Sequence, residues 1–324
     1  MVLLWGLRED GPLAAVHEAL RRRGLPVALL DQSDLLEAEI ELEVGKDVRG
    51  RIVHGAESID LEAVSAAYVR CDDWRRLPGF AGQGEGSAAW EHMMRFDDAL
   101  ITWLEITPAR VVNRLSAMAP NGSKPFQLAW IRDLGFDVPE TLVTTDPEAA
   151  RAFHRRHGEV IYKSVSGVRS IVSRLTREGL ERLGDIRWCP TQFQAYVPGT
   201  DYRVHVVGRR LFVAEIRCEG DDYRYAARDD IAVEVVTGEV PPAIARRCVA
   251  MARAMQLEVA GIDLRRTPEG RWYCFEVNPS PAFSYYEAHT GQAIGEAIAD
   301  LLAAPAGRRG QVPAAEQQMA MPAG

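Results

Sequence analysis

Residues 261–278, "GIDLRRTPEGRWYCFEVN", constrain the fold most, because two strands of alternating character flank one turn signal. With Glu269 and Gly270 at the centre of the turn, the strands form a hairpin in which Asp263 lies directly opposite Glu276. Asn278 follows Glu276 by two residues and therefore points to the same face. The pattern predicts two carboxylates and a carboxamide gathered on one face of a sheet.

Two opposed carboxylates repel each other and destabilise a hairpin unless a cation lies between them. Asp263, Glu276 and Asn278 offer hard oxygen ligands, which favour Mg²⁺ or Mn²⁺ and leave positions for water or phosphate oxygens. We therefore predict a metal site here. The alternative is a slipped register, in which Asp263 lies in solvent on the other face.

The composition is that of an ordinary globular protein, and the formal net charge of −8 argues against nucleic acid or an anionic membrane as partner. The five cysteines are widely spaced and form no CxxC pair, which is typical of free thiols in a reducing compartment. No apolar run approaches the ~20 residues of a membrane span. We expect a cytoplasmic protein; a homo-oligomer remains open.

The chain begins with a strand–helix–strand pattern, "MVLLWGL", "GPLAAVHEALRRRGL" and "PVALLD", which is typical of a parallel sheet. A long helix is expected over residues 88–106, before the short strand "VVNR". We expect four regions: an N-terminal α/β domain on the substrate side (1–115), a small α+β lid (116–187), a C-terminal subdomain with the metal hairpin (188–303), and a disordered tail (304–324).

A metal held by few protein ligands is normally shared with a phosphorylated substrate. The chain has no GxxxxGK[ST] loop and no convincing GxGxxG, which argues against Walker-type and Rossmann sites. Two isolated lysines are better candidates for phosphate binding. Lys163 lies inside the strand "VIYKSV", where an unpaired charge is costly, and Lys124 starts the helix "KPFQLAW", whose N-terminus adds positive potential. The alternative for both is a solvated surface lysine.

Together these segments resemble the ATP-grasp superfamily over residues ~110–303. The order is similar: "NGSKPFQLAWIRDLGFDVPETLVT", "VIYKSV", "FQAYVPGTDYRVHVVG" and finally "GIDLRR…CFEVNPSPAF". The resemblance implies an α/β protein of the ATP-grasp fold, with an N-terminal α/β (pre-ATP-grasp) domain, a small α+β lid and a C-terminal α+β nucleotide and metal domain.

Two branches of the superfamily are similar. "DYRVHVVGRRLFVAEIR" and "EVNPSPAF" resemble the ribosomal-protein glutamate ligases, which add amino acids to a peptide carboxylate. "FDVPETLVTTDPEAARAF", "IYKSVS" and "DDYR" resemble the graspetide ligases, which macrocyclise peptides through side-chain esters or amides. That branch typically has a Gly-Gln-Trp-like run after the Asn-Pro pair, whereas this chain has "SPAFSYYE".

The resemblance also implies roles for individual residues. Lys124 and Lys163 match the lysines that contact the ATP phosphates, and Asp263, Glu276 and Asn278 match the metal ligands. Nucleotide binding is further implied for Gln194, Ala195, Tyr196 and Val197, whose backbone reads adenine, and for Asp201 on the ribose. Arg217 matches an arginine near the transferred phosphate, with Arg203 supporting that charge cluster. Substrate contacts are assigned to Arg224, Tyr223 and Arg70.

These parts imply an ATP-dependent ligase. A carboxylate attacks the γ-phosphate, and an amine or hydroxyl then attacks the acyl phosphate, with Mg²⁺ and cationic side chains offsetting the charge. The expected partners are a peptide or amino-acid carboxylate and an amine or hydroxyl acceptor. The alternatives are a phosphotransferase on the same fold, a catalytically silent nucleotide-binding protein, and an enzyme that uses Cys274 or Cys218.

Overall fold

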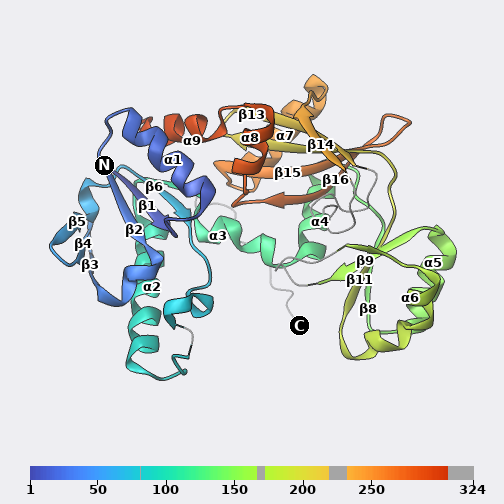
Figure 1. The fold of residues 1–324 in the computed structure, drawn as a ribbon, viewed down its shortest axis with the longest axis horizontal. Coiled ribbons are helices and arrows are strands. Elements are labelled where there is room, and N and C mark those ends of the chain that lie inside the picture. Colours follow the sequence, from blue (N-terminus) through green and yellow to red (C-terminus); the bar gives the residue numbers. More distant parts are fainter. Residues whose placement is uncertain (81, 166–171, 219–231, 306–324) are drawn as a thin grey trace, which may run out of the picture.

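The computed structural model describes residues 1–80, 82–165, 172–218 and 232–305. Figure 1 shows three parts side by side: the N-terminal domain in blue to teal, a C-terminal sheet in yellow to red, and a lid in yellow-green. Most of the expected tail, residues 306–324, lies outside the described residues. Within the described part, no helix combines the length and the apolar character that crossing a membrane requires.

The N-terminal domain is built on a parallel sheet of order β2-β1-β6-β7, as the opening pattern predicts. Its strands are β1 (Val2–Gly6), β2 (Val27–Asp31), β6 (Ala66–Arg70) and β7 (Arg110–Val112). One face packs on α2 (Ala88–Ile106) and on a small antiparallel sheet, β3 (Ala38–Val44), β4 (Val48–His54) and β5 (Glu57–Asp60). The other face packs on α1 (Gly11–Arg22) and on α9 (Ile294–Ala303) from the chain's other end.

The C-terminal part is an antiparallel sheet of order β14-β13-β12-β15-β16. Its strands are β12 (Thr200–Val207), β13 (Arg210–Cys218), β14 (Val233–Thr237), β15 (Val259–Arg266) and β16 (Trp272–Asn278). One face packs on α7 (Pro242–Ala254) and α4 (Lys124–Asp133), and Tyr286 from α8 (Ser284–Thr290) packs on the other. A short helix, α3 (Leu115–Met118), follows the N-terminal domain.

The lid is a second antiparallel sheet, of order β10-β9-β11-β8, with its own apolar core. It contains β8 (Thr141–Thr144), α5 (Pro147–His157), β9 (Val160–Ser164), β10 (Ser173–Arg174), α6 (Arg177–Glu181) and β11 (Thr191–Ala195). Figure 1 shows α5 and α6 on the side of this sheet that is turned away from the rest of the molecule. The opposite face is therefore turned inward.

The cores divide the chain differently from the boundaries expected at residues 116 and 187. Ile131 and Phe136 pack in the core of the C-terminal sheet, so the segment that follows residue 116 does not belong to the lid core. Strand β11 pairs with both β9 and β8, so the lid sheet extends beyond residue 187 to Ala195. A compact lid thus spans about residues 141–195, since strand pairing across the sheet decides where β11 belongs.

Candidate active site

The predicted metal ligands lie on β15 and β16, on one face of the C-terminal sheet. We call Asp263, Glu276 and Asn278 the metal cluster. Asp263 pairs with Glu276, and Gly261 pairs with Asn278, so the three polar side chains share one face. The register predicted from the sequence is confirmed. All three side chains remain partly accessible, so a ligand can reach them.

The turn itself differs from the expectation by half a residue. Leu264 pairs with Cys274 next to the turn, which puts the turn centre on Glu269 alone. The register shifts between Asp263 and Leu264, leaving Phe275 as the extra residue of a β-bulge. The bulge restores the pairing of Asp263 with Glu276, so the shift of the turn centre and the extra residue of the bulge compensate each other.

Arg203 supplies a positive charge to this cluster. It lies on β12 directly opposite Asp263, and its Nη1 donates to Asp263 Oδ1 at 2.5 Å. In the amide orientation that satisfies both of its ends, Asn278 accepts from Arg203 Nη1 at 3.0 Å and donates to Glu276 Oε1 at 3.3 Å. Arg203 thus supplies part of the positive charge that the two opposed carboxylates require.

Arg203 is only 6% exposed, and other residues surround its guanidinium closely. A Cβ at Gly261 would come within 2.4 Å of Arg203 Nη2, so a side chain there would displace the guanidinium. The ring of Tyr286 lies 5.6 Å from Arg203 Cζ, in cation–π range. Sequence reasoning missed Gly261 and Tyr286 because their role depends on contacts between distant strands.

His205 is a further neighbour of Arg203 that the sequence did not reveal. Its Nε2 accepts from Arg203 Nε at 3.4 Å, and its ring packs on Tyr286 with centroids 5.0 Å apart. Burial, together with the charge of Arg203, lowers the pKa of His205 well below its usual range. The imidazole is therefore neutral, which suits its role as acceptor for the arginine.

The donor set fits a small hard cation. Asp263, Glu276 and Asn278 offer oxygen atoms on one face, which is the ligand chemistry of Mg²⁺ or Mn²⁺. Among the described residues no group of three or more His, Cys, Asp or Glu side chains could hold a metal ion. A cation at this hairpin would therefore need oxygens from water or phosphate as well, as the sequence argument requires.

Helix α4 is attached to the outer edge of β16, the strand that carries Glu276 and Asn278 and is called the metal strand below. Gln127 brackets Val277, donating to its carbonyl at 2.8 Å and accepting from its N–H at 3.0 Å. Lys124, one turn earlier on the same side of the helix, is only 8% exposed. Lys124 is thus a buried lysine beside β16, and the surface alternative does not apply to it.

The inward face of the lid carries the second lysine. Lys163 on β9 is 9% exposed and pairs with Gln192 on β11, while Ile161 pairs with Gln194. These four side chains share one face, and Tyr162 and Phe193 point to the other, into the lid core. Lys163 is therefore buried on the inward face. A buried charge within a strand is costly unless it is compensated, and an anionic ligand would compensate it.

In the linker at the end of β11, residues 195–197, several backbone groups already form hydrogen bonds within the protein. The N–H of Ala195 donates to Glu140 and that of Tyr196 donates to Glu159, both at 2.9 Å. The carbonyl of Val197 accepts from Arg265 Nη1 at 2.9 Å. Among the described residues, the N–H of Val197 has no partner and is available to a ligand.

Asp201 has a partner that the sequence did not predict. Arg265 donates from Nε and Nη2 to its two carboxylate oxygens, at 2.6 and 2.8 Å. The same arginine also holds the Val197 carbonyl, so the pair fixes the linker to the sheet. Both carboxylate oxygens of Asp201 already have a donor, which weakens the expectation that they bind ribose.

Arg217 lies on the opposite face of the sheet from the metal cluster, contrary to expectation. Arg203 pairs with Ala214, so Arg217 shares its face with Glu215 and Tyr202 instead. Its guanidinium is 56% exposed and donates to Glu215 at 2.9 Å and to Glu234 at 3.0 Å. Two acidic neighbours account for this arginine, which does not take part in the cluster around Asp263.

The remaining substrate candidates divide into two groups. The side chain of Arg70 is 8% exposed and donates to both oxygens of Asp10, at 2.6 and 3.0 Å, and to Ser280 Oγ and the Pro281 carbonyl. It therefore ties the N-terminal sheet to the loop after the metal strand, and its donors are occupied by protein groups. Tyr223 and Arg224 lie outside the described residues.

Asn113 makes a second connection of this kind, which no local sequence pattern predicts. Its amide nitrogen donates to the carbonyls of Val259 and Pro279, at 2.7 and 2.5 Å. Its amide oxygen accepts from the N–H of Glu258 at 2.8 Å. The strand that bears Asp263 and the residue after Asn278 are thus fixed to the N-terminal domain by one buried side chain.

The cysteines offer no nucleophile at this site. Cys274 is fully buried, and burial raises the pKa of its thiol well above the usual range. Burial likewise raises the pKa of Cys248 to about 12. Cys218 is at the end of β13, two strands away from the metal hairpin. Cys274 and Cys248 thus pack as buried apolar groups, which argues against Cys274 as a nucleophile.

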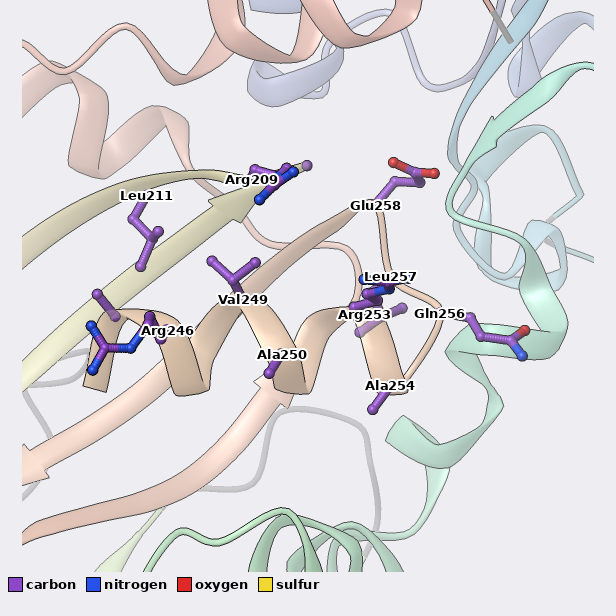
Figure 2. A pocket seen from close by; sticks show the side chains of 12 residues that line it. Arg209, Leu211, Arg246, Val249, Ala250, Arg253, Ala254, Gln256, Leu257 and Glu258 are labelled. Carbon is purple, nitrogen blue, oxygen red and sulfur yellow. The ribbon is translucent and has the colours of Figure 1, made fainter. Parts of the chain in front are cut away.

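A groove of about 1100 Å³ lies on the α7 side of the sheet, away from the metal cluster. Figure 2 shows its lining, which combines apolar side chains with arginines: Leu211, Val249, Ala250, Arg209, Arg246 and Arg253. The three arginines are exposed and, within the described chain, form no ion pair. In a chain of net charge −8, this groove is a local concentration of positive charge.

Comparison with known proteins defines the class. Residues 127–302 match the model of the RimK-like ATP-grasp domain. The probable alpha-L-glutamate ligase of Pseudoalteromonas translucida (strain TAC 125) is 23% identical over 280 residues, which cover 80% of this chain and 92% of that protein. The probable alpha-L-glutamate ligase 2 of Shewanella amazonensis is 31% identical over 104 residues, covering 32% and 34% of the two chains.

Solved structures agree over nearly the whole chain. The macrocyclase MdnC of Microcystis aeruginosa MRC, bound with precursor peptide MdnA, has a TM-score of 0.75 at 22% identity, covering 93% of this chain and 98% of that one. The ATP-grasp ligase PsnB, complexed with a minimal precursor, Mg and ADP, has a TM-score of 0.72 at 28% identity, covering 93% and 96%.

The chain belongs to the RimK-like ATP-grasp family, since the family model covers more than half of it. It has the ATP-grasp fold and is an ATP-grasp ligase, an enzyme that forms an amide or ester bond. The family uses ATP and Mg²⁺, and solved relatives contain ADP and Mg. The resemblance read from the sequence is confirmed for the family, the fold and the enzyme class.

Proposed function

We propose that this protein uses ATP and Mg²⁺ to activate a carboxylate as an acyl phosphate and then joins it to an amine or hydroxyl of a peptide substrate. The observation that carries the proposal is the cluster of Asp263, Glu276 and Asn278 around the buried guanidinium of Arg203. This arrangement combines hard oxygen ligands with a fixed positive charge, which phosphoryl transfer requires.

The chain's own residues divide the binding work. Asp263, Glu276 and Asn278 hold the cation, which supplies charge compensation for the phosphates when bound. Lys163 on the lid and Lys124 at the start of α4 contact phosphate oxygens from two sides. The N–H of Val197 donates to the adenine ring. Asp201 acts through Arg265 as a positioning residue, because that pair fixes the Val197 carbonyl.

The chemistry has two balanced steps. A substrate carboxylate oxygen attacks the γ-phosphorus, the bond from that phosphorus to the β,γ-bridging oxygen breaks, and ADP leaves. An amine nitrogen or hydroxyl oxygen then attacks the carbonyl carbon of the acyl phosphate, loses its proton, and releases inorganic phosphate. Arg203 is held by His205 and Tyr286 next to the cation ligands, where its charge stabilises the phosphoryl oxygens in both steps.

A peptide substrate is supported by solved relatives and by the groove beside α7. PsnB and MdnC are described with precursor peptides, and both match this chain over nearly its full length. The groove offers apolar lining with three exposed arginines, which suits an amphipathic segment with acidic residues. We propose that such a segment anchors the peptide there, while another part of it reaches Asp263 and Arg203.

Macrocyclisation is the finer candidate within this function. It is supported by MdnC, described as a macrocyclase, whereas the curated relatives are described as probable glutamate ligases. The two outcomes differ in mass: a macrocycle loses one water for each link, whereas addition of an amino acid increases the mass. Incubation of the enzyme with ATP, Mg²⁺ and candidate peptides, followed by mass spectrometry, distinguishes them.

The acyl phosphate provides the direct test of the proposal. Hydroxylamine should trap it as a hydroxamate in the presence of ATP, Mg²⁺ and the acid substrate. Ligation should release inorganic phosphate together with the condensed product. A product that retains the phosphoryl group would instead establish the phosphotransferase alternative, and ATP binding without turnover of any acid would favour a silent nucleotide-binding protein.

The groove has its own test. Arg246→Glu combined with Arg253→Glu should weaken binding of an acidic peptide, because like charges then face each other, and should leave ATP affinity unchanged. Arg95→Glu, on the exposed side of α2, is the matched control. Equal peptide affinity in the double variant and the control would exclude the groove as the anchor.

A further inference from the structure

The buried glutamines among the described residues differ sharply in their hydrogen bonding. Gln32 donates to the carbonyl of Asp72 at 3.0 Å and accepts from its N–H at 2.8 Å, and Gln127 brackets Val277 in the same way. Gln192 is 0% exposed, and among the described residues neither its Oε1 nor its Nε2 has a partner. A buried amide with both ends unsatisfied is rare, because each end loses its water without compensation.

The position of Gln192 indicates where its partner comes from. It pairs across the sheet with Lys163 and shares the inward lid face with Gln194, whose Oε1 is also without a partner. Nε2 of Gln194 donates to Thr141 Oγ1 at 3.0 Å, so only one end of that amide is open. Three unsatisfied amide atoms therefore lie on the face that carries Lys163.

We propose that the carboxamide of Gln192 reads the N6/N7 edge of adenine, with Oε1 accepting from the N6 amine and Nε2 donating to N7. A glutamine amide matches this edge in two hydrogen bonds, which is the geometry by which Gln and Asn recognise adenine in nucleic acids. Guanine and hypoxanthine carry a carbonyl in place of the N6 amine and do not match it. Gln192 is thus a specificity-determining residue for the nucleotide.

This inference rests on the proposed ATP site, and its test separates the two. The probes are ATP, 7-deaza-ATP, which replaces N7 by C–H, and ITP, which replaces the N6 amine by a carbonyl. Wild-type enzyme should bind ATP more tightly than either analogue, by roughly 5- to 150-fold as for one bidentate base contact. Because a linker backbone can also read N6, 7-deaza-ATP is the more selective probe.

Gln192→Leu removes the amide while keeping its approximate shape. Its affinity for ATP should fall because both amide contacts are lost, and its affinity for 7-deaza-ATP should fall less because only the contact to N6 is lost there. The preference of the enzyme for N7 should therefore disappear. Gln192→Met is the second variant in case Leu packs poorly. Both are measured by calorimetry with nucleotide alone, so that peptide binding and turnover do not enter.

Thermal unfolding of the nucleotide-free protein gives an independent readout. Gln192→Leu should hold or raise Tm, because no protein hydrogen bond is lost, whereas the matched control Gln32→Leu should lower Tm and leave the nucleotide preference unchanged. An unchanged preference for N7 in both Gln192 variants overturns the inference, as does a loss of Tm equal to that of Gln32→Leu. Failure of the wild-type enzyme to bind any purine triphosphate would instead overturn the ATP site itself.

Discussion

The C-terminal sheet and the lid present opposite kinds of polar surface to the proposed nucleotide site. On the sheet, the buried charges are paired within the protein: Arg203 with Asp263, and Arg265 with Asp201. On the lid, the amides of Gln192 and Gln194 are buried with atoms that no group of the described residues satisfies. The sheet is therefore arranged before the nucleotide arrives, whereas the lid face is completed only by a ligand.

This contrast predicts that changes to the paired charges of the sheet affect both chemistry and stability, while changes on the lid affect ligand binding alone. The N-terminal domain also helps to hold the sheet side of the site in place. Arg70 and Asn113 connect this domain to the loop after Asn278 through buried and partly buried hydrogen bonds, so the metal strand is held from two sides. The lid has its own core and no such tie to the metal strand within the described residues.

The largest effect is expected from Glu276→Gln. Loss of one anionic ligand should lower ATP-dependent turnover by about 10²-fold or more, on the scale of removing one charge-stabilising group. The metal-free protein should keep or gain stability, because Glu276 forms no ion pair among the described residues and repels Asp263. ADP release and urea unfolding check the two parts; a marked loss of stability would contradict the account.

Asp263→Asn is the matched change on the opposite strand and sharpens the comparison. Turnover should fall by a similar factor, but the metal-free protein should also lose about 1–3 kcal/mol, because the buried guanidinium of Arg203 loses its anionic partner. Urea unfolding without Mg²⁺ separates the two variants. Equal stability of Asp263→Asn and Glu276→Gln would show that Arg203 does not depend on Asp263.

A smaller effect is expected on the lid from Lys163→Met. The ammonium compensates phosphate charge in a partly desolvated site, where a charge-assisted hydrogen bond contributes about 1.5–3 kcal/mol, or roughly 10- to 150-fold in affinity. Calorimetry with ATP and Mg²⁺ measures this loss, and thermal unfolding of the free protein should change little. Unchanged ATP affinity would remove Lys163 from the site and undo the contrast between sheet and lid.

The sequence predicted the sheet side of the site better than the lid side. The hairpin register around Asp263 and Glu276 follows from a local turn and from strand alternation, both of which are short-range signals. The lid boundary depends on the pairing of β11 with β8 and β9, which are distant in the chain. Likewise, the missing partners of Gln192 become visible only when every neighbouring group is in place.

The placement of Arg217 was wrong although the sequence held the signal for it. The turn at Gly208-Arg209 pairs Val207 with Arg210, and continuing that register pairs Arg203 with Ala214. Arg217 then falls on the other face, with Tyr202 and Glu215. The turn and the strand alternation in "DYRVHVVGRRLFVAEIR" therefore predict this face for Arg217, as they predict the face of Glu276 in the metal hairpin. Asp201 differs, because its pairing with Arg265 requires the neighbouring strand β15.

The smallest effect is expected from Arg217→Ala. This residue lies on the face of the C-terminal sheet opposite to the metal cluster, so the variant tests whether that face takes part in the reaction. Its two carboxylate partners are shared with solvent, and exposed ion pairs contribute little. Ligation and ATP affinity should therefore stay within roughly twofold of wild type. Arg203→Lys, one strand away on the metal face, should lower ligation by about 10²-fold, because an ammonium cannot reproduce the contacts of the guanidinium to Asp263, Asn278 and His205. A loss of ligation in Arg217→Ala comparable to that in Arg203→Lys would mean that the exposed face of β13 takes part in the reaction, and the acceptor would then have to be sought there.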